Sequence, residues 1–135
     1  MLVSQLAKRS GTSTETVRYY TRIGLLKPRQ TQGNGYRHYA EQDINLLNFI
    51  QRAKLLGFSL KDIRQILEKA KAGNSPCPRV RDMIKARIAE TRARLEQLKQ
   101  LQSRMEEALL QWESMPDRSP DGNSICHLIE SIELP

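Results

Sequence analysis

Two cysteines, Cys77 and Cys126, are the residues of this 135-residue chain with the most distinctive chemistry. Cys77 lies between Pro76 and Pro78, and Cys126 directly precedes His127. A lone cysteine is usually a small buried hydrophobe, but neither position continues an apolar stripe. Each precedes an expected helix N-terminus, where the helix dipole favours the thiolate, the form that binds soft metals. The two positions therefore indicate a thiolate site for a soft metal ion.

Oxidation is the alternative chemistry for the same two thiols. Two thiols that face each other across a dimer could form an intersubunit disulfide under oxidative stress. The N-terminus lacks the layout of an export signal, so we expect a cytoplasmic protein whose thiols are normally reduced. A metal sensor would bind its ion through reduced thiols, whereas a redox sensor would change its mobility on a non-reducing gel.

The composition argues against an enzyme and against a membrane protein. The chain has two His and two Cys, and they form no convincing pair of nucleophile and general base. Aromatic residues make up 5% and charged residues 27%, which suits a small helical protein with long solvated helix faces. No apolar run is long enough to span a membrane.

The positive charge is concentrated in the first half of the chain. Residues 1–72 contain 13 Lys/Arg and 5 Asp/Glu, whereas residues 73–135 contain 9 and 10. A basic head joined to a neutral tail is typical of a phosphate-binding domain followed by a partner-binding segment. The asymmetry favours a nucleic-acid partner, although a solvated basic surface would have the same composition.

Two short helices joined by a glycine-containing turn are expected at the start of the chain. The sequence predicts a helix over residues 3–9, a turn at Gly11, and a second helix. That second helix begins after the N-cap Ser13 and stops at Gly24. This is the helix-turn-helix pattern, which a generic helical hairpin shares.

A small β-hairpin, or wing, is expected after Pro28, because Asn34-Gly35 is a strong tight-turn pair. Two further helices are expected over residues 41–56 and from Ser59 to near Gly73. We expect their apolar side chains to form the core of this head: Ile44, Leu47, Ile50, Leu55, Leu60, Ile63, Ile66 and Leu67.

The second helix carries side chains suited to the major groove of DNA. Arg can pair bidentately with guanine, while Thr and Tyr can contact phosphates or thymine methyl groups. The wing adds further side chains, and the end of the third helix could hold the DNA backbone as a second wing. We expect at least one of Tyr19 and Tyr20 to belong mostly to the core. The candidate DNA-binding residues are Thr14, Thr16, Arg18, Tyr19, Tyr20, Arg22, Tyr36, Arg37, Tyr39, Arg52 and Lys54.

A long helix without Gly or Pro is expected from about Arg79 to Trp112, with a length of about 51 Å. Its apolar residues recur at spacings of three and four, as in a coiled coil, with an interruption at Thr91. A partner protomer is the simplest way to bury this seam, and packing against the chain's own head is the alternative. The seam consists of Val80, Ile84, Ile88, Leu95, Leu98, Leu101, Met105, Leu109 and Trp112.

The expected fold class is mainly α. A winged helix-turn-helix DNA-binding head occupies residues 1–72, and a dimerisation helix occupies residues 73–112. An effector loop with a short closing helix occupies residues 113–135.

Several motifs resemble the MerR family of regulators in their order and spacing, from residue 1 to about 112. They are Thr16-Val17-Arg18-Tyr19-Tyr20, Gly24-Leu25-Leu26 with Pro28, Gly35-Tyr36-Arg37-His38-Tyr39, and Leu56-Gly57-Phe58-Ser59-Leu60 with Ile63. The resemblance implies a homodimer joined by an antiparallel coiled coil of the long helices. It implies binding to double-stranded promoter DNA whose spacer is too long for bacterial RNA polymerase. It further implies that an effector makes the protein bend and untwist this spacer, at a cost of a few kcal/mol.

The resemblance is greatest to the metal-sensing branch of that family. Cys77 matches a family cysteine at the start of the long helix, which meets the loop of the other protomer, and Cys126 matches the cysteine at the far end of that loop. The copper(I)-sensing branch usually lacks the first cysteine, so the resemblance points to a divalent ion such as mercury, cadmium, lead or zinc. The family loop usually opens with a further cysteine, and Asp117 stands near that place here. Asp117 or His127 would then be the third ligand, with Met115 a weaker candidate. A DNA-binding protein without an effector is the remaining alternative, and its DNA binding would be indifferent to metal and oxidant.

Overall fold

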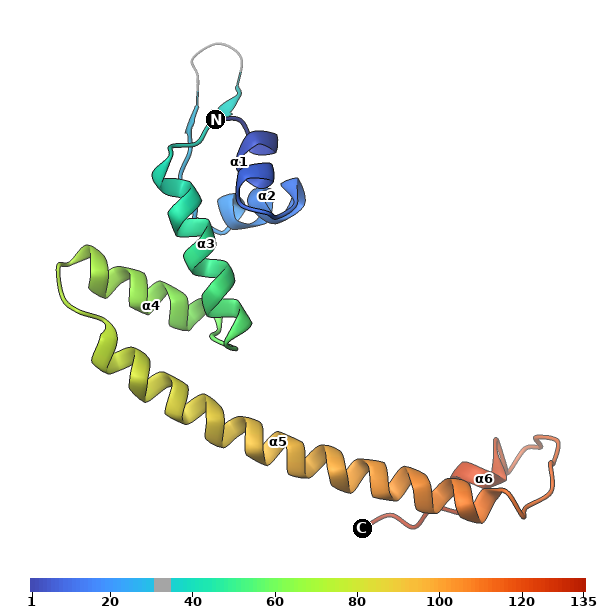
Figure 1. The fold of residues 1–135 in the computed structure, drawn as a ribbon. Helices are drawn as coiled ribbons and strands as arrows, with labels where there is room; N and C mark the ends of the chain where they lie inside the picture. The colour runs from blue at the N-terminus through green and yellow to red at the C-terminus, as the bar shows by residue number, and fades with distance from the viewer. Residues whose placement is uncertain (31–34) are drawn as a thin grey trace. The chain divides into compact units, whose positions relative to one another are not determined.

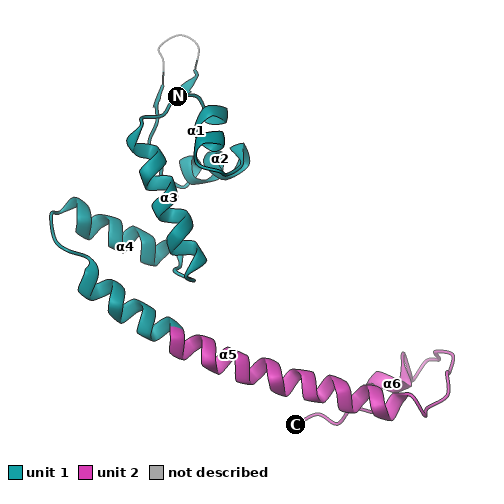
Figure 2. Cartoon of the chain, viewed as in Figure 1, with its two compact units in different colours: residues 1–87 teal, residues 88–135 magenta. Residues whose placement is uncertain are grey.

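The structure is a computed structural model that describes residues 1–30 and 35–135 (Figure 1). The prediction of a mainly α-helical fold with a helix-turn-helix head is confirmed. The helices are α1 (Val3–Arg9), α2 (Thr14–Arg22), α3 (Gln42–Leu55), α4 (Leu60–Lys71), α5 (Cys77–Trp112) and α6 (His127–Glu130), and the strands are β1 (Arg29–Gln30) and β2 (Arg37–His38). The chain divides into two compact units, residues 1–87 and residues 88–135 (Figure 2).

Local hydrogen bonds at the two ends of α2 determine its length. The side chain of Ser13 accepts a hydrogen bond from the backbone N–H of Thr16, at 3.1 Å, as an N-cap does. At the other end, Gly24 has a φ of +85°, which a residue with a Cβ rarely adopts. This turn directs the N–H groups of Leu25 and Leu26 back to the carbonyl oxygen of Tyr20. The boundaries predicted from Ser13 and Gly24 therefore have a direct structural cause.

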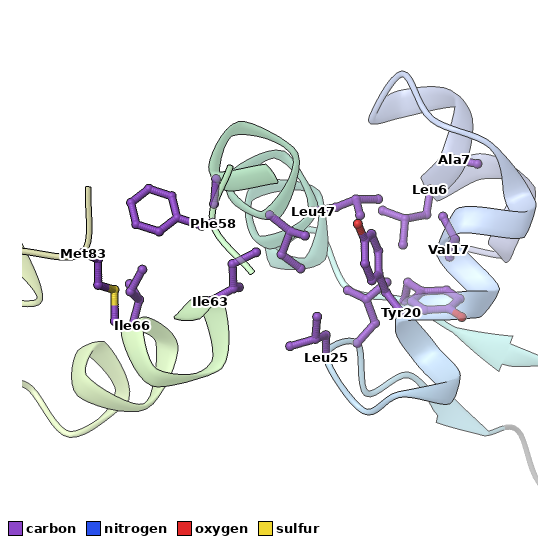
Figure 3. Close-up of a cluster of buried hydrophobic side chains, with 14 residues drawn as sticks. Leu6, Ala7, Val17, Tyr20, Leu25, Leu47, Phe58, Ile63, Ile66 and Met83 are labelled. Atoms are coloured by element: carbon purple, nitrogen blue, oxygen red, sulfur yellow. The ribbon is translucent and has the colours of Figure 1, made fainter. Parts of the chain in front are cut away.

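The core of unit 1 extends from α1 and α2 through α3 to α4 and the first turns of α5 (Figure 3). Among the predicted core residues, Leu47, Ile50, Ile63 and Ile66 are buried, and Ile44, Leu60 and Leu67 are partly buried against the same cluster.

The prediction that Leu55 belongs to this core is wrong, because its side chain is 88% exposed. Leu55 lies five residues after Ile50, which turns it about 140° away from the buried face of an α-helix. Ala53, three residues after Ile50, occupies the buried position instead.

The predicted wing is a short antiparallel ribbon in which Arg29 pairs with His38 and Gln30 pairs with Arg37. The predicted Asn34-Gly35 turn lies partly outside the described residues, since Asn34 is not among them.

The start of α5 differs from the sequence-based expectation in two respects. The helix begins at Cys77 rather than near Arg79, since Pro78 is compatible with a first helical turn. Its first turns pack on the head, because Met83 is buried in the core cluster and Val80 and Ile84 lie partly buried against it. The alternative of packing against the chain's own head therefore holds for this part of the seam.

Beyond this part of α5, the apolar seam is exposed within the single chain. The exposed fractions range from 39% for Leu101 to 60% for Met105, and Ile88, Leu95, Leu98 and Leu109 lie between these values. In residues 1–30 and 35–135, we find no helix long and apolar enough to cross a membrane.

Candidate DNA-binding surface and thiol sites

Helix α2 separates a buried face from an exposed polar face. Val17 and Tyr20 face the core, whereas Arg18, Tyr19 and Arg22 are exposed. The exposed side chains surround a shallow hollow of about 420 Å³, to which Glu15, Thr16 and Tyr20 also contribute. Because guanidinium and hydroxyl groups here point away from the core, this face can meet phosphates or base edges.

The aromatic side chain of Tyr19 orders part of this exposed face. The guanidinium carbon of Arg22 lies 5.4 Å from the centroid of the Tyr19 ring, which is a cation–π contact. The ring of Tyr19 is also 5.6 Å from that of Tyr20, centroid to centroid, at an interplanar angle of 50°. Arg22 is therefore held by stacking, so that its position on the surface is partly fixed before any ligand arrives.

Two of the candidate DNA-binding tyrosines belong to the core. Tyr20 is 8% exposed and Tyr39 is 4% exposed, as expected for at least one of the Tyr19-Tyr20 pair. Burial raises the pKa of the Tyr20 phenol, and the neighbouring Tyr19 raises it further. The hydroxyl of Tyr39 is used inside the protein, since it lies 2.7 Å from Oγ1 of Thr21. Tyr39 is therefore a scaffolding residue beneath the surface that the other candidates form. Tyr20 is mostly buried as well, but it also lines the hollow beside α2.

The wing and the end of α3 present the remaining candidates. Tyr36 is 62% exposed and Arg37 is exposed beside it, and Arg52 and Lys54 are exposed at the end of α3. Thr14 is half-buried.

Two further basic side chains lead into the wing and are absent from the candidates chosen from the sequence. Lys27 and Arg29 flank Pro28, and both are exposed. Their positive charge and their position just before the expected hairpin would have been enough to choose them as DNA-binding candidates from the sequence. Since Arg29 pairs with His38 in the ribbon, it lies on the same wing as Arg37.

Both cysteines are free thiols. Cys77 is exposed and is the first residue of α5, and its backbone N–H donates to Oγ of Ser75 at 3.3 Å. Cys126 is half-buried and is the N-cap residue of α6. Helix α6 is a single turn of four residues, whereas α5 has 36 residues.

The candidate third ligand His127 is oriented by the loop that precedes it. Its Nε2 lies 2.7 Å from the carbonyl oxygen of Pro116. A carbonyl can only accept, so Nε2 carries the proton, and Nδ1 of the neutral ring has a free lone pair. A metal-binding histidine typically has this arrangement, with its second nitrogen donating to a carbonyl. The donor set next to Cys126 therefore fits a soft or borderline metal ion.

The end of the loop next to Cys126 is held by Glu130. Its carboxylate accepts hydrogen bonds from the hydroxyl of Ser124, at 2.5 Å, and from the backbone N–H of Ile125, at 2.9 Å. These two hydrogen bonds lower the pKa of Glu130. Asp117 is exposed and Met115 is half-buried, and no group of three or more His, Cys, Asp or Glu is positioned to hold a metal within the part of one chain that the structure describes.

A helix-turn-helix with a basic wing, followed by a long helix with an exposed apolar seam, defines a DNA-binding regulator. Residues 1–70 match the family described as MerR HTH family regulatory protein, and residues 44–108 match the one described as MerR, DNA binding. The chain belongs to the MerR family of transcriptional regulators, which confirms the resemblance and the prediction that it is not an enzyme.

Curated relatives agree with this assignment, and a solved structure shares the fold. The chain is 36% identical over 106 residues to the HTH-type transcriptional regulator HmrR of Rhizobium leguminosarum bv. viciae, covering 78% of this chain and 81% of that one. It is 31% identical over 132 residues to the mercuric resistance operon regulatory protein of Bacillus cereus, covering 96% and 95%. The fold resembles that of the transcription regulator PbrR691 from Ralstonia metallidurans CH34 in complex with lead(II), with a TM-score of 0.74, 24% identity, and coverage of 97% and 98%.

Proposed function

We propose that the chain is a metal-responsive regulator that binds promoter DNA as a homodimer and activates transcription by distorting the promoter spacer. The proposal is carried by the two accessible free thiols, which lie at the starts of α5 and α6. The chain that holds them is similar along nearly its whole length to a regulator of mercuric resistance. Thiolates bind soft divalent ions, and mercury, cadmium, lead and zinc are the candidates.

DNA binding would use the exposed face of α2 together with the wing. Arg18, Arg22 and Arg37 would contribute positive charge toward the phosphates, and Arg52 and Lys54 would hold the backbone farther along. Thr14, Thr16, Tyr19 and Tyr36 would add hydroxyl and aromatic contacts. Sequence specificity would come largely from the free-energy cost of deforming the spacer. RNA polymerase would engage the two promoter elements once the spacer is bent and untwisted.

The dimer would form along the exposed seam of α5. The apolar side chains from Ile88 to Leu109 lie at coiled-coil spacing and are uncovered in one chain. An antiparallel pair of these helices would bring Cys77 of one protomer close to the loop that ends at Cys126 of the other. Each ion would then be held by one thiolate from each protomer, with Nδ1 of His127 or the carboxylate of Asp117 as a third donor.

A metal titration of the reduced protein tests this function. Thiolate-to-metal charge-transfer absorbance should rise with added Hg(II) and reach a plateau at one ion per chain. The variants Cys77→Ser and Cys126→Ser should lose this absorbance and the metal-induced increase in transcription in a reconstituted assay, while they bind operator DNA as the wild type does. Ser103→Ala on α5 and Ser119→Ala in the loop, both at exposed positions, are the matched controls. A normal metal response in either cysteine variant would contradict the proposal.

A redox response is the second candidate function, and the exposure of the free thiol of Cys77 favours it. In that case, Cys77 and Cys126 of two protomers would be oxidised to a disulfide, with a peroxide as the electron acceptor. Peroxide treatment would then produce a covalent dimer on a non-reducing gel, and transcription would respond without added metal. A metal sensor gives neither result, so the two candidates are separated by one gel.

A further inference from the structure

Helix α4 is hydrogen-bonded to α5 on one side and to the end of α2 on the other. The guanidinium of Arg87 donates to Oδ2 of Asp62, from Nη2 at 2.5 Å and from Nε at 3.2 Å. Two residues farther along α4, Nη2 of Arg64 donates to the carbonyl oxygen of Ile23, the C-cap residue of α2. Since successive residues of an α-helix are turned by about 100°, Asp62 and Arg64 lie on nearly opposite sides of α4. The buried Ile63 between them faces the core.

The Asp62–Arg87 ion pair lies where α5 packs on the head. Arg87 continues the spacing of Val80, Met83 and Ile84, the stripe of α5 that contacts the core cluster. The side chains of Arg87 and Asp62 are only 33% and 16% exposed, so solvent screens this pair less than a surface pair. Asp62 also accepts a hydrogen bond from the backbone N–H of Ser59, at 3.0 Å, and so belongs to the capping box of α4. A displacement of α5 therefore acts on the first turn of α4.

The hydrogen bond from Arg64 is made beside a groove rather than inside a filled core. A groove of about 450 Å³ separates part of α4 from α3 and from the residues that follow α2, and Leu25, Leu46 and Leu67 are among its lining residues. Close-packed interiors resist displacement, whereas a groove of this size leaves room for side chains to shift. On this side, the hydrogen bond from Arg64 to Ile23 adds a directed contact between α4 and the end of α2 to the apolar packing of the core cluster.

We propose that α4 couples α5 to the recognition helix α2, with Arg87, Asp62 and Arg64 as positioning residues. A shift of α5 is passed to α4 through Asp62, and α4 passes it through Arg64 to the C-terminal end of α2, where Arg22 lies. This proposal rests on the proposed function in one respect only, because it takes metal binding at the start of α5 as the cause of the shift. The coupling itself exists in the metal-free head and can be measured there.

A double-mutant cycle on the full-length, metal-free protein tests the coupling. Operator affinity is measured by fluorescence anisotropy on a duplex selected by the wild-type protein from a random-sequence library. Arg64→Gln and Arg87→Gln should each lower this affinity severalfold, and the double variant should lower it little further, because either change interrupts the same connection. Independent sites would instead give additive losses. Arg64→Lys, which keeps a donor and the charge, should restore most of the affinity, and Lys69→Gln on the exposed side of α4 controls for lost charge.

The metal response provides a second readout that a purely structural role would not change. The wild type and both Gln variants should bind Hg(II) with the same stoichiometry by charge-transfer absorbance, while the fold-activation of transcription drops by roughly 2- to 30-fold in the variants. Failure of the wild type to bind Hg(II) would overturn the proposed function but leave the double-mutant cycle valid. Additive affinity losses in the cycle, or full activation in both variants, would overturn the coupling through α4.

Discussion

Tyr39 joins the wing to the helix pair through a short chain of hydrogen bonds. Its hydroxyl lies 2.7 Å from Oγ1 of Thr21, and that oxygen donates in turn to the carbonyl of Val17, at 2.8 Å. The Thr21 hydrogen is used by Val17, so the Tyr39 hydroxyl is the donor to Thr21. Tyr39, at the base of the wing, is in this way fixed to the last turn of α2.

The substitution Tyr39→Phe should reduce stability more than it reduces DNA binding. The loss of one buried hydrogen bond should lower the free energy of unfolding by about 0.5–1.5 kcal/mol, as measured by urea denaturation. Tyr19→Phe, at an exposed position of α2, keeps the ring contacts of Tyr19 and should change it by less than about 0.5 kcal/mol. A large loss of operator affinity in Tyr39→Phe at unchanged stability would instead place the Tyr39 hydroxyl on the DNA.

Arg18 is exposed on α2, and we expect it to contact phosphate rather than a base. Arg18→Ala should then weaken binding to all duplexes alike and reduce the slope of log affinity against log salt by about one. If Arg18 contacts a base instead, Arg18→Ala should lose about 1–3 kcal/mol of discrimination between matched and mismatched duplexes at a single base pair. The measurement is a salt titration on matched and single-mismatch duplexes, with Arg118→Ala, an exposed charge outside the head, as the control. Loss of discrimination at one base pair would refute phosphate contact.

At the scale of elements, the first turn of α4 depends on the charge of Asp62. Burial acts to raise the pKa of Asp62, but hydrogen bonds from Arg87 and Ser59 outweigh it and hold that pKa below the ordinary value of 3.8. A carboxylate with a lowered folded-state pKa contributes stability above the unfolded value and loses this contribution as pH falls through the folded value. This part of the stability should therefore be complete at neutral pH and disappear below about pH 4.

Asp62→Asn should remove this pH-dependent contribution while it keeps an acceptor for the cap. The free energy of unfolding at pH 7 should drop by about 1.5–3 kcal/mol, the usual range for hydrogen bonds to charged groups. Below pH 4, the free energies of unfolding of the variant and the wild type should become more similar. Urea denaturation at several pH values measures this change. Asp82→Asn, at an exposed position of α5, should show neither effect. An equal loss at pH 7 and at pH 3 would exclude the ionised carboxylate as the cause.

The elements defined by local signals were predictable from the sequence, and those defined by distant contacts were not. Ser13, Gly24 and Ser59 act within one turn of their own helices, so the boundaries of α2 and α4 followed from residue type. Met83 was not recognised as a core residue, because the seam pattern of α5 says nothing about which face the head covers.

The same limit applies to the polar contacts of the candidate sites. Asp62 and Arg87 are 25 residues apart, and many other acidic and basic side chains compete for such a pairing in the sequence. Tyr39 was proposed as a DNA contact because its type suits one, and only its packing on Thr21 shows the buried role. The cysteine positions, in contrast, could be chosen from the sequence, since their residue type alone determines their chemistry.

At the scale of the whole molecule, the exposed seam of α5 predicts a dimer. Replacing Leu95 and Leu98 by Glu should produce monomers, because each leucine would lose apolar burial of about 1.5–3 kcal/mol per chain and place a charge in the interface. Analytical ultracentrifugation should show this change, and operator binding should be lost with it. The control carries Glu at Gln97 and Gln100, exposed positions off the seam, and should remain dimeric. A wild-type protein that sediments as a stable monomer in dilute solution would refute this architecture.

Mixed dimers test whether the proposed metal site is shared between protomers. When one chain carries Cys77→Ser and the other Cys126→Ser, a shared site loses both thiolates at one end of the dimer and keeps both at the other. The heterodimer should therefore bind half as much Hg(II) as the wild type, with charge-transfer absorbance per ion unchanged. Sites built within single chains would each lack one thiolate, and the heterodimer would bind no ion in the two-thiolate mode. Two differently tagged chains, purified on both tags and titrated beside each homodimeric variant, distinguish these outcomes. Full wild-type stoichiometry in the heterodimer would show that neither cysteine is required, and a ligand set without these thiols would then have to hold the ion.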